Sequence, residues 1–269
     1  MASHWIVRHG AMRFLGEFDP EAGSYARGDE VVVRTERGLE LGQVLCPASP
    51  RAVELLAEPT RGRIVRRLTD KDRAEGARLQ VLEQREMETC NRFVGQRHLQ
   101  MELVDVEHLF GGERLVFYFL AEKRVDFREL VKDLARQFQT RIEMRQIGVR
   151  DEAKLLADYG DCGKPVCCNT HMTAMPPVSM RMAKLQKSTL DPSKISGRCG
   201  RLKCCLRFEQ DVYEEFQAGL PAVGARVLTA KGQGRVLAQE ILARRLLVEF
   251  EDGRRLPVAA AEVLTRLGR

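Results

Sequence analysis

The chain has 269 residues, of which 44% are hydrophobic and 30% charged, and its formal net charge is +6. This is the composition of a globular protein with room for two or three domains. No apolar run is long enough for a signal peptide or a membrane span, so we expect a cytoplasmic protein without membrane insertion. A reducing cytosol also argues against a framework of structural disulfides.

Residues 1–60 are predicted to form a small β-barrel-like module. Residues 30–35 and 39–45 have the pattern of two strands joined by an Arg-Gly turn. Cys46 follows the second strand, and we interpret it as a packing residue.

Residues 61–215 are predicted to form an α+β core. Residues 69–97 have the apolar spacing of a long helix, with Thr69 and Asp72 in the positions of a capping box. Cys90 lies on the apolar stripe of this helix, which favours a buried side chain over a metal ligand.

The next elements of this core are expected in the order strand, strand, helix, strand. Residues 115–120 are apolar on both faces, as in a central strand. The order predicts an antiparallel sheet covered by helices on one face. The expected ranges are 101–109, 115–120, 126–138 and 140–147.

Residues 219–269 are predicted to form a separate SH3-like β module. Four short strand patterns are separated by turns at Lys231-Gly232 and Asp252-Gly253. The whole chain is therefore predicted to be α+β, with an antiparallel sheet, helices, small β-barrel modules and a cysteine-rich metal-binding segment.

That segment, residues 160–205, contains a duplicated motif of the form G-x-C-G-[KR]-x-x-C-C. Its two copies begin at Gly160 and Gly197 and hold six of the eight cysteines. Sulfur clustered in this way binds soft metals, forms disulfides or carries out redox chemistry. The candidate metal ligands are Cys162, Cys167, Cys168, Cys199, Cys204 and Cys205.

The positive charge of the chain is concentrated on the same segment. Residues 162–208 contain nine Lys and Arg side chains and a single acidic one, Asp191. These cations could offset the charge of metal-bound thiolates, or they could attract the phosphates of a nucleic acid. The candidate nucleic-acid or partner contacts are Lys164, Lys184, Lys187, Arg198, Arg201, Lys203 and Arg207.

The spacing of the cysteines leaves three chemistries open. Zinc needs four ligands, which would leave two of the six cysteines unused. Iron–sulfur clusters also take four thiolates, and both motifs begin with the C-x4-C spacing of plant-type ferredoxins, although the next cysteine here is adjacent. A metal-free C-x4-C disulfide switch is the third. The feasible zinc set is Cys162, Cys167, Cys199 and Cys204.

The adjacent cysteines bear on how many sites there are. If this segment is extended, neighbouring side chains point to opposite sides, and Cys167 and Cys168 then do not easily serve one compact site. Six ligands exceed one four-cysteine site and fall short of two. Ligands from a partner chain, His171 or a second copy of the chain would complete the set.

Residues 162–184 and 194–205, together with 28–42, resemble the RicT family, which is also called YaaT and carries a PSP-one C-terminal domain. The resemblance implies an iron–sulfur protein with 4Fe-4S clusters, one or two in number, held by the six cysteines. It also implies assembly with two small helical partners, RicA and RicF. Such a complex assists ribonuclease Y in messenger RNA processing and affects sporulation.

No hydrolytic constellation is visible in the sequence. The five histidines are dispersed, and there is no phosphate loop, G-x-S-x-G or H-E-x-x-H motif. We therefore predict a non-enzymatic regulatory subunit. The alternatives are a zinc-stabilised RNA-binding protein and a thiol redox protein without metal.

Overall fold

The structure, a computed structural model, describes residues 4–21, 23–56, 59–156, 159–172 and 174–267. The outer ends of the predicted N- and C-terminal modules, 1–3 and 268–269, lie outside these ranges. The chain divides into two compact units. The first unit comprises Met1–Met175 with Arg198–Arg201, and the second comprises Pro176–Gly197 with Leu202–Arg269.

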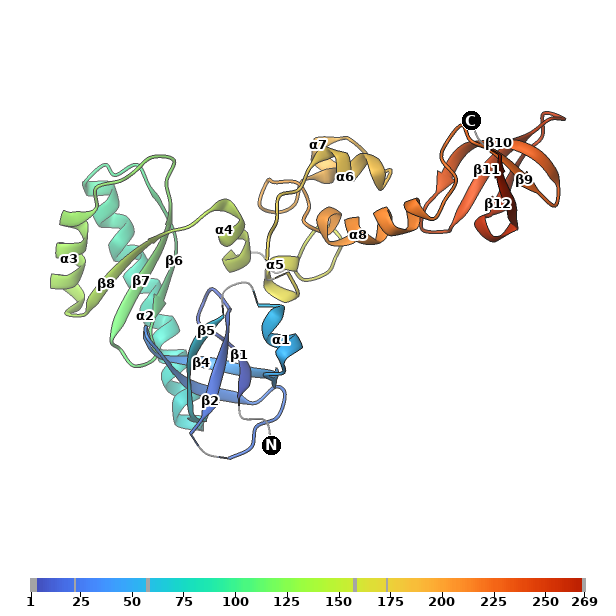
Figure 1. Ribbon diagram of the computed structural model, residues 1–269. Coiled ribbons are helices and arrows are strands. Elements are labelled where there is room, and N and C mark those ends of the chain that lie inside the picture. The colour runs from blue at the N-terminus through green and yellow to red at the C-terminus, as the bar shows by residue number, and fades with distance from the viewer. Residues whose placement is uncertain (1–3, 22, 57–58, 157–158, 173, 268–269) are drawn as a thin grey trace. The chain divides into compact units, whose positions relative to one another are not determined.

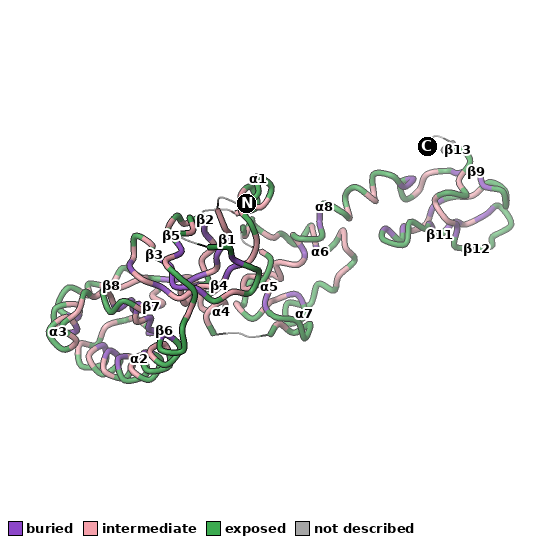
Figure 2. The backbone as a smooth tube through the Cα atoms, turned by 90° about the horizontal axis from the view of Figure 1, so that it is seen from below, coloured by how far each residue is buried: buried purple, intermediate pink, exposed green. Residues whose placement is uncertain are grey.

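The first unit begins with a closed barrel of five strands in the order β1-β2-β5-β3-β4 (Figure 1). β2 and β5 run parallel, and the other neighbouring pairs are antiparallel. Valine side chains, Phe18 and Ile64 fill its interior. In Figure 2 the buried segments follow these strands. The elements are β1 (Trp5–His9), β2 (Phe14–Pro20), β3 (Glu30–Thr35), β4 (Gly38–Pro47), α1 (Pro50–Glu54) and β5 (Thr60–Arg67).

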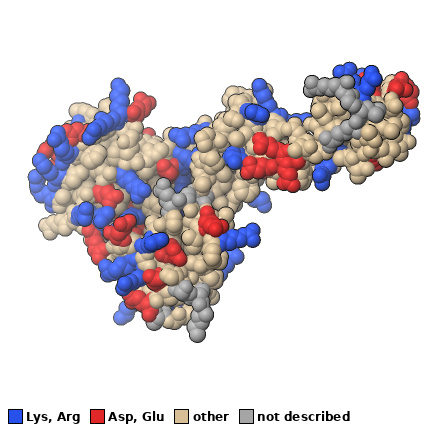
Figure 3. Space-filling view, viewed as in Figure 1, with Lys and Arg blue, Asp and Glu red and all other residues tan. Residues whose placement is uncertain are grey.

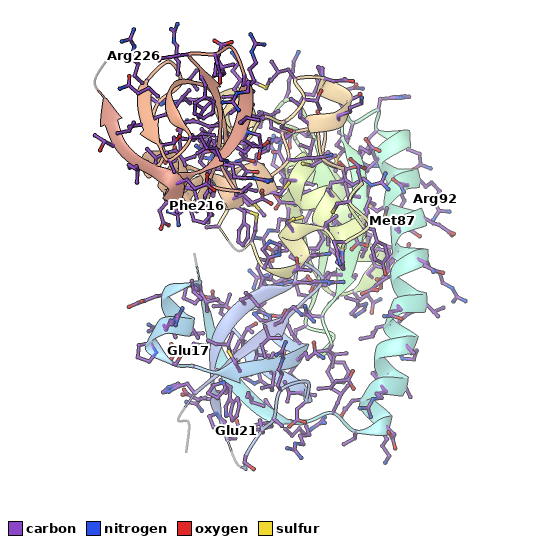
Figure 4. All side chains as sticks on the ribbon, turned by 90° about the vertical axis from the view of Figure 1, so that its right-hand side faces the viewer. Glu17, Glu21, Met87, Arg92, Phe216 and Arg226 are labelled. Carbon is purple, nitrogen blue, oxygen red and sulfur yellow. The ribbon has the colours of Figure 1, made fainter. Side chains whose placement is uncertain are left out.

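A long helix, α2 (Asp70–Gln96), follows the barrel. The predicted capping box is confirmed, because the Thr69 hydroxyl accepts the Asp72 N–H and the Asp72 carboxylate accepts the Thr69 N–H. Met87 points toward the neighbouring strands and Arg92 points away from them (Figure 4). The helix thus presents one apolar side to the sheet.

The sheet beside this helix has three strands in the order β6-β7-β8, and α2 and α3 pack on the same face of it. Both faces of the central strand β7 are buried, as its sequence predicted. Cys90 of α2 is completely buried in the layer between helices and sheet. The elements are β6 (Glu102–His108), β7 (Arg114–Leu120), α3 (Arg128–Phe138), β8 (Arg141–Gln146) and α4 (Val149–Leu156).

The sheet is mixed rather than wholly antiparallel. β6 and β7 form the expected antiparallel hairpin, but β8 runs parallel to β7, with Phe117 opposite Met144. The reason is the connection: α3 carries the chain back along the sheet, so the next strand starts at the same end as β7.

The second face of the sheet packs on the β1–β2 turn of the barrel and on α4. Val116 and Tyr118 of β7 contact Met12 and its neighbours in a second apolar cluster. The barrel and the sheet therefore form one continuous unit rather than two independent modules.

The second unit contains three helices and an antiparallel sheet in the order β12-β11-β10-β9-β13. Phe216 of α8 packs against the buried core of that sheet. Acidic side chains gather over α8 (Figure 3). The elements are α6 (Met180–Leu185), α7 (Pro192–Ile195), α8 (Cys205–Ala218), β9 (Arg226–Thr229), β10 (Gly232–Glu240), β11 (Arg245–Phe250), β12 (Arg255–Ala259), η1 (Ala260–Glu262) and β13 (Val263–Leu267).

Among the residues that the structure describes, no helix combines the length and the apolar composition needed to cross a bilayer.

Candidate metal centre

The two cysteine motifs adopt the same local fold. In the first, residues 159–168, a β-bridge joins Tyr159 to Pro165, and in the second, residues 196–205, a β-bridge joins Ser196 to Leu202. Each bridge closes a short loop around the first cysteine of its motif. We call these loops the first and the second knuckle. The sequence repeat is therefore also a structural repeat.

Each knuckle reverses direction at the glycine that follows its first cysteine. Gly163 has φ +73° and Gly200 has φ +70°, a region that residues with a Cβ rarely occupy. A Cβ built at either glycine would have no atom within 4 Å, so space is not the reason for the glycine. The backbone conformation alone requires Gly in C-G-[KR].

The paired cysteines mark the start of a helix in both knuckles. The short helix α5 (Cys167–Thr170) begins at the first pair. Cys204 is the N-cap residue of α8 and Cys205 is its first residue. A helix start turns successive side chains through about 100° rather than to opposite sides. The cysteine pairs are therefore not extended, and the opposite orientation of Cys167 and Cys168 that an extended segment would give does not apply.

The tip of the second knuckle belongs to the first unit. Arg198 Nε donates a hydrogen bond to the Tyr159 carbonyl at 3.1 Å and lies 3.8 Å from the Asp161 carboxylate. These contacts place the residue before Cys199 against the residues before Cys162. Four of the six cysteines thus belong to the first unit and two, Cys204 and Cys205, to the second.

None of the eight cysteines forms a disulfide. Cys162 is exposed, and the other five motif cysteines are half-buried. Burial raises the pKa of the Cys205 thiol, and the neighbouring Cys204 and Glu209 raise it further. A raised pKa is the opposite of what activates a thiol for exchange chemistry.

The chemistry of the donors suits a thiophilic metal, since six thiols lie on two knuckles of one design. Within the described ranges, however, no three His, Cys, Asp or Glu side chains are close enough together to hold a metal ion. The donor types therefore fit an iron–sulfur cluster or zinc.

The two cysteines outside the motifs lie in barrel and core elements. Burial raises the pKa of Cys90 to about 12, as for an inert core thiol. Cys46 lies in β4 and is half-buried.

The predicted contact cations divide into two groups. Four make intramolecular contacts: Arg198 as above, Lys187 to the Gln239 carbonyl, Lys203 to the Lys194 carbonyl at 2.7 Å, and Arg207 to Asp211 at 2.7 Å. The other three, Lys164, Lys184 and Arg201, are exposed, and no ion pair or side-chain hydrogen bond joins them to another described residue. Lys164 and Arg201 occupy equivalent positions, each directly after the knuckle glycine.

A cationic cavity beside the first knuckle was not anticipated from the sequence. Arg8, Arg13 and Lys154 line it together with Cys168. These cations are far apart in sequence and belong to no motif, so no local pattern could have joined them.

Comparisons with known proteins give two family matches. Residues 62–147 match the "PSP1 C-terminal conserved region", and residues 177–220 match the "PSP1-like protein, third domain". The first match runs from β5 to the end of β8, and the second from just before α6 through α8. These regions place the chain among PSP1-type proteins.

A curated relative covers most of the chain. The "Stage 0 sporulation protein YaaT" of Bacillus subtilis (strain 168) is 44% identical over 239 residues, which are 87% of this chain and 84% of that protein. The chain therefore belongs to the YaaT (RicT) family, as the cysteine motifs indicated.

The remaining comparisons give less information about the family of this chain. "Uncharacterized protein PB7E8.02" of Schizosaccharomyces pombe (strain 972 / ATCC 24843) is 31% identical over 129 residues, 48% of this chain but 14% of that protein. No solved structure matches the chain.

Proposed function

We propose that the protein is a non-enzymatic iron–sulfur regulatory subunit. It acts in the cytoplasm with small helical partners of the RicA and RicF kind, and it modulates messenger RNA processing and turnover by ribonuclease Y. The duplicated knuckle, with three thiols in each copy, is the observation that carries this proposal. The name of the Bacillus relative supports a role in a sporulation pathway.

The six motif cysteines are the proposed ligands of one or two 4Fe-4S clusters. Such clusters take four thiolates each, and when bound they supply a redox-active and oxygen-sensitive centre. The chain itself contributes the knuckles, which fix the direction of each first cysteine, and the cations Lys164 and Arg201, which offset thiolate charge. We expect ligands from a partner chain, His171 or a second copy of the chain to complete the set.

Exposed apolar side chains beside the first knuckle support a protein partner. Leu156 at the end of α4 is 59% exposed, and Tyr159 at the start of the knuckle is 58% exposed. Large apolar side chains that lie near each other in sequence and are open to solvent are suited to contact with a protein partner. A partner helix that covered them would also shield the knuckle from water.

Anaerobic purification followed by an absorption spectrum, iron and acid-labile sulfide analysis tests the proposal. We expect a brown protein whose iron content falls by at least half in Cys162→Ser and in Cys199→Ser. Cys46→Ser is the matched control and should keep the iron. A colourless protein with stoichiometric zinc would exclude the iron–sulfur proposal.

The second candidate, a zinc-stabilised RNA-binding protein, has one specific observation in its favour. Lys164, Lys184 and Arg201 are exposed cations without an ion-pair partner among the described residues. Direct RNA binding predicts an affinity that falls steeply with salt and a smaller salt slope in a Lys164→Gln/Arg201→Gln variant. An RNA affinity that is weak at all salt concentrations would reject it.

A further inference from the structure

A cavity of about 430 Å³ lies in the first unit, between one side of the barrel and the α4–α5 region. Its walls come from β1, the β1–β2 turn, β4, α4 and the segment after the first knuckle. The size is within the range of small-molecule sites in proteins.

Among the residues that the structure describes, the charged side chains lining the cavity are all basic: Arg8 from β1, Arg13 from the β1–β2 turn and Lys154 from α4. Arg8 donates to the Gln43 side chain at 2.7 Å, which holds its guanidinium in place without neutralising it. Clustered cations repel each other, so an anion bound among them would be stabilised.

Burial lowers the pKa of Arg8, and the charge of Arg13 lowers it further. These two cations are thus close enough to influence each other in a partly desolvated site.

A polar atom without a partner lies in the same wall. The side-chain carbonyl oxygen of Asn169 is buried and accepts no hydrogen bond from any described residue. A buried acceptor that is left unpaired destabilises the folded state. Phe14 and Leu45 also line the cavity and are apolar.

The backbone of Arg13 has an unusual conformation, which fixes where its side chain begins. Arg13 has φ +49°, in the left-handed region that a non-glycine residue seldom adopts. Its N–H closes the β1–β2 turn on the Gly10 carbonyl at 3.0 Å. The turn thereby holds the guanidinium beside the cavity at the cost of backbone strain.

We propose that this cavity binds a small anion with at least two negative charges. Arg8, Arg13 and Lys154 contact the charged groups, and any apolar part of the anion lies on Phe14. Polyphosphate and polycarboxylate compounds share this chemistry. Because Cys168 lies in the same wall, an occupant would cover one side of the first knuckle.

Isothermal titration calorimetry on the full-length, anaerobically purified protein tests the proposal. The probes are pyrophosphate and citrate, added at constant ionic strength. We expect saturable one-site binding of at least one probe, and the tighter of the two identifies the source of the charge. Lys154→Met and Arg13→Gln should each weaken binding about tenfold, and the double variant should weaken it further.

The matched controls are Arg150→Gln, on the same helix as Lys154 but outside the cavity, and Arg27→Gln on the exposed barrel surface. Both should bind like the wild type. Equal weakening in the controls would show general charge attraction and overturn the proposal. So would the absence of binding for both probes at millimolar concentration in a folded wild-type protein, as judged by circular dichroism.

Discussion

The guanidinium of Arg37, in the β3–β4 turn, forms an ion pair with the carboxylate of Glu107 in β6, and so links the barrel to the three-stranded sheet. Glu107 also accepts the Ala11 N–H at 2.8 Å and the Tyr118 hydroxyl at 2.6 Å. Burial alone would lower the pKa of Arg37. The charges of Glu107 and Glu40 outweigh this effect and hold the pKa above its usual value. One carboxylate thus receives donors from three separate parts of the first unit.

Loss of the Glu107 charge is therefore expected to destabilise the first unit. Glu107→Gln leaves the buried Arg37 cation with only part of its counter-charge, and we expect a loss of about 2–4 kcal/mol in the free energy of unfolding. Urea denaturation followed by fluorescence measures it. The exposed pair Arg34–Glu113, at 3.9 Å, supplies the control, because Glu113→Gln should change stability by less than about 0.5 kcal/mol. Equal effects of the two substitutions would contradict the buried link.

Glu83 of α2 makes the stability depend on pH. Burial raises its pKa to about 7, and the N–H of His108, which it accepts at 2.9 Å, opposes the shift. Its ordinary value is 4.5, so between about pH 4.5 and 7 the folded state binds a proton that the unfolded state has released. The contribution of Glu83 to stability therefore falls as the pH rises through this window.

Replacing Glu83 with Gln removes this titration and retains an acceptor for the His108 N–H. We expect Glu83→Gln to stabilise the protein by about 1–2 kcal/mol at pH 8 and to have little effect at pH 4.5, after allowance for the partial exposure of the side chain. Chemical denaturation across the pH range checks it. Glu88→Gln, exposed on the same helix, should show no such pH-dependent difference.

The knuckle glycines should resist replacement for conformational reasons. Gly163→Ala and Gly200→Ala put a Cβ at positive φ, which disfavours the observed backbone by about 1–2 kcal/mol. We expect each variant to lose iron relative to the wild type, as measured by metal analysis. Gly95→Ala in α2 is the matched control: a Cβ there also meets nothing within 4 Å, but the backbone is helical. It should keep its metal and gain about 0.5 kcal/mol.

A substitution at Cys90 tests whether this cysteine contributes to core packing or to metal binding. Cys90→Ala removes a completely buried sulfur from the layer between α2 and the sheet, and we expect a loss of about 1–2 kcal/mol with unchanged iron content. Thermal unfolding and metal analysis on the same preparation measure both. A drop in iron with stability intact would mean that Cys90 is a ligand.

The sequence by itself determined the features that rest on local spacing. The Thr69–Asp72 capping box and the apolar β7 run are encoded within a few residues, and each formed as predicted. The family resemblance was visible for the same reason, because the cysteine spacing is itself a local pattern. Local chemistry decides such elements before any tertiary contact is made.

Only the tertiary structure decided how distant segments meet. The parallel pairing of β8 with β7 depends on where α3 returns the chain, which residue periodicity does not encode. Arg37 and Glu107 form an ion pair although they are 70 positions apart. Arg8 of the barrel and Lys154 of α4 line the same cavity. Charged side chains carry no periodic signal of their partners, because long-range pairing follows from the packing of the apolar faces that bring them together.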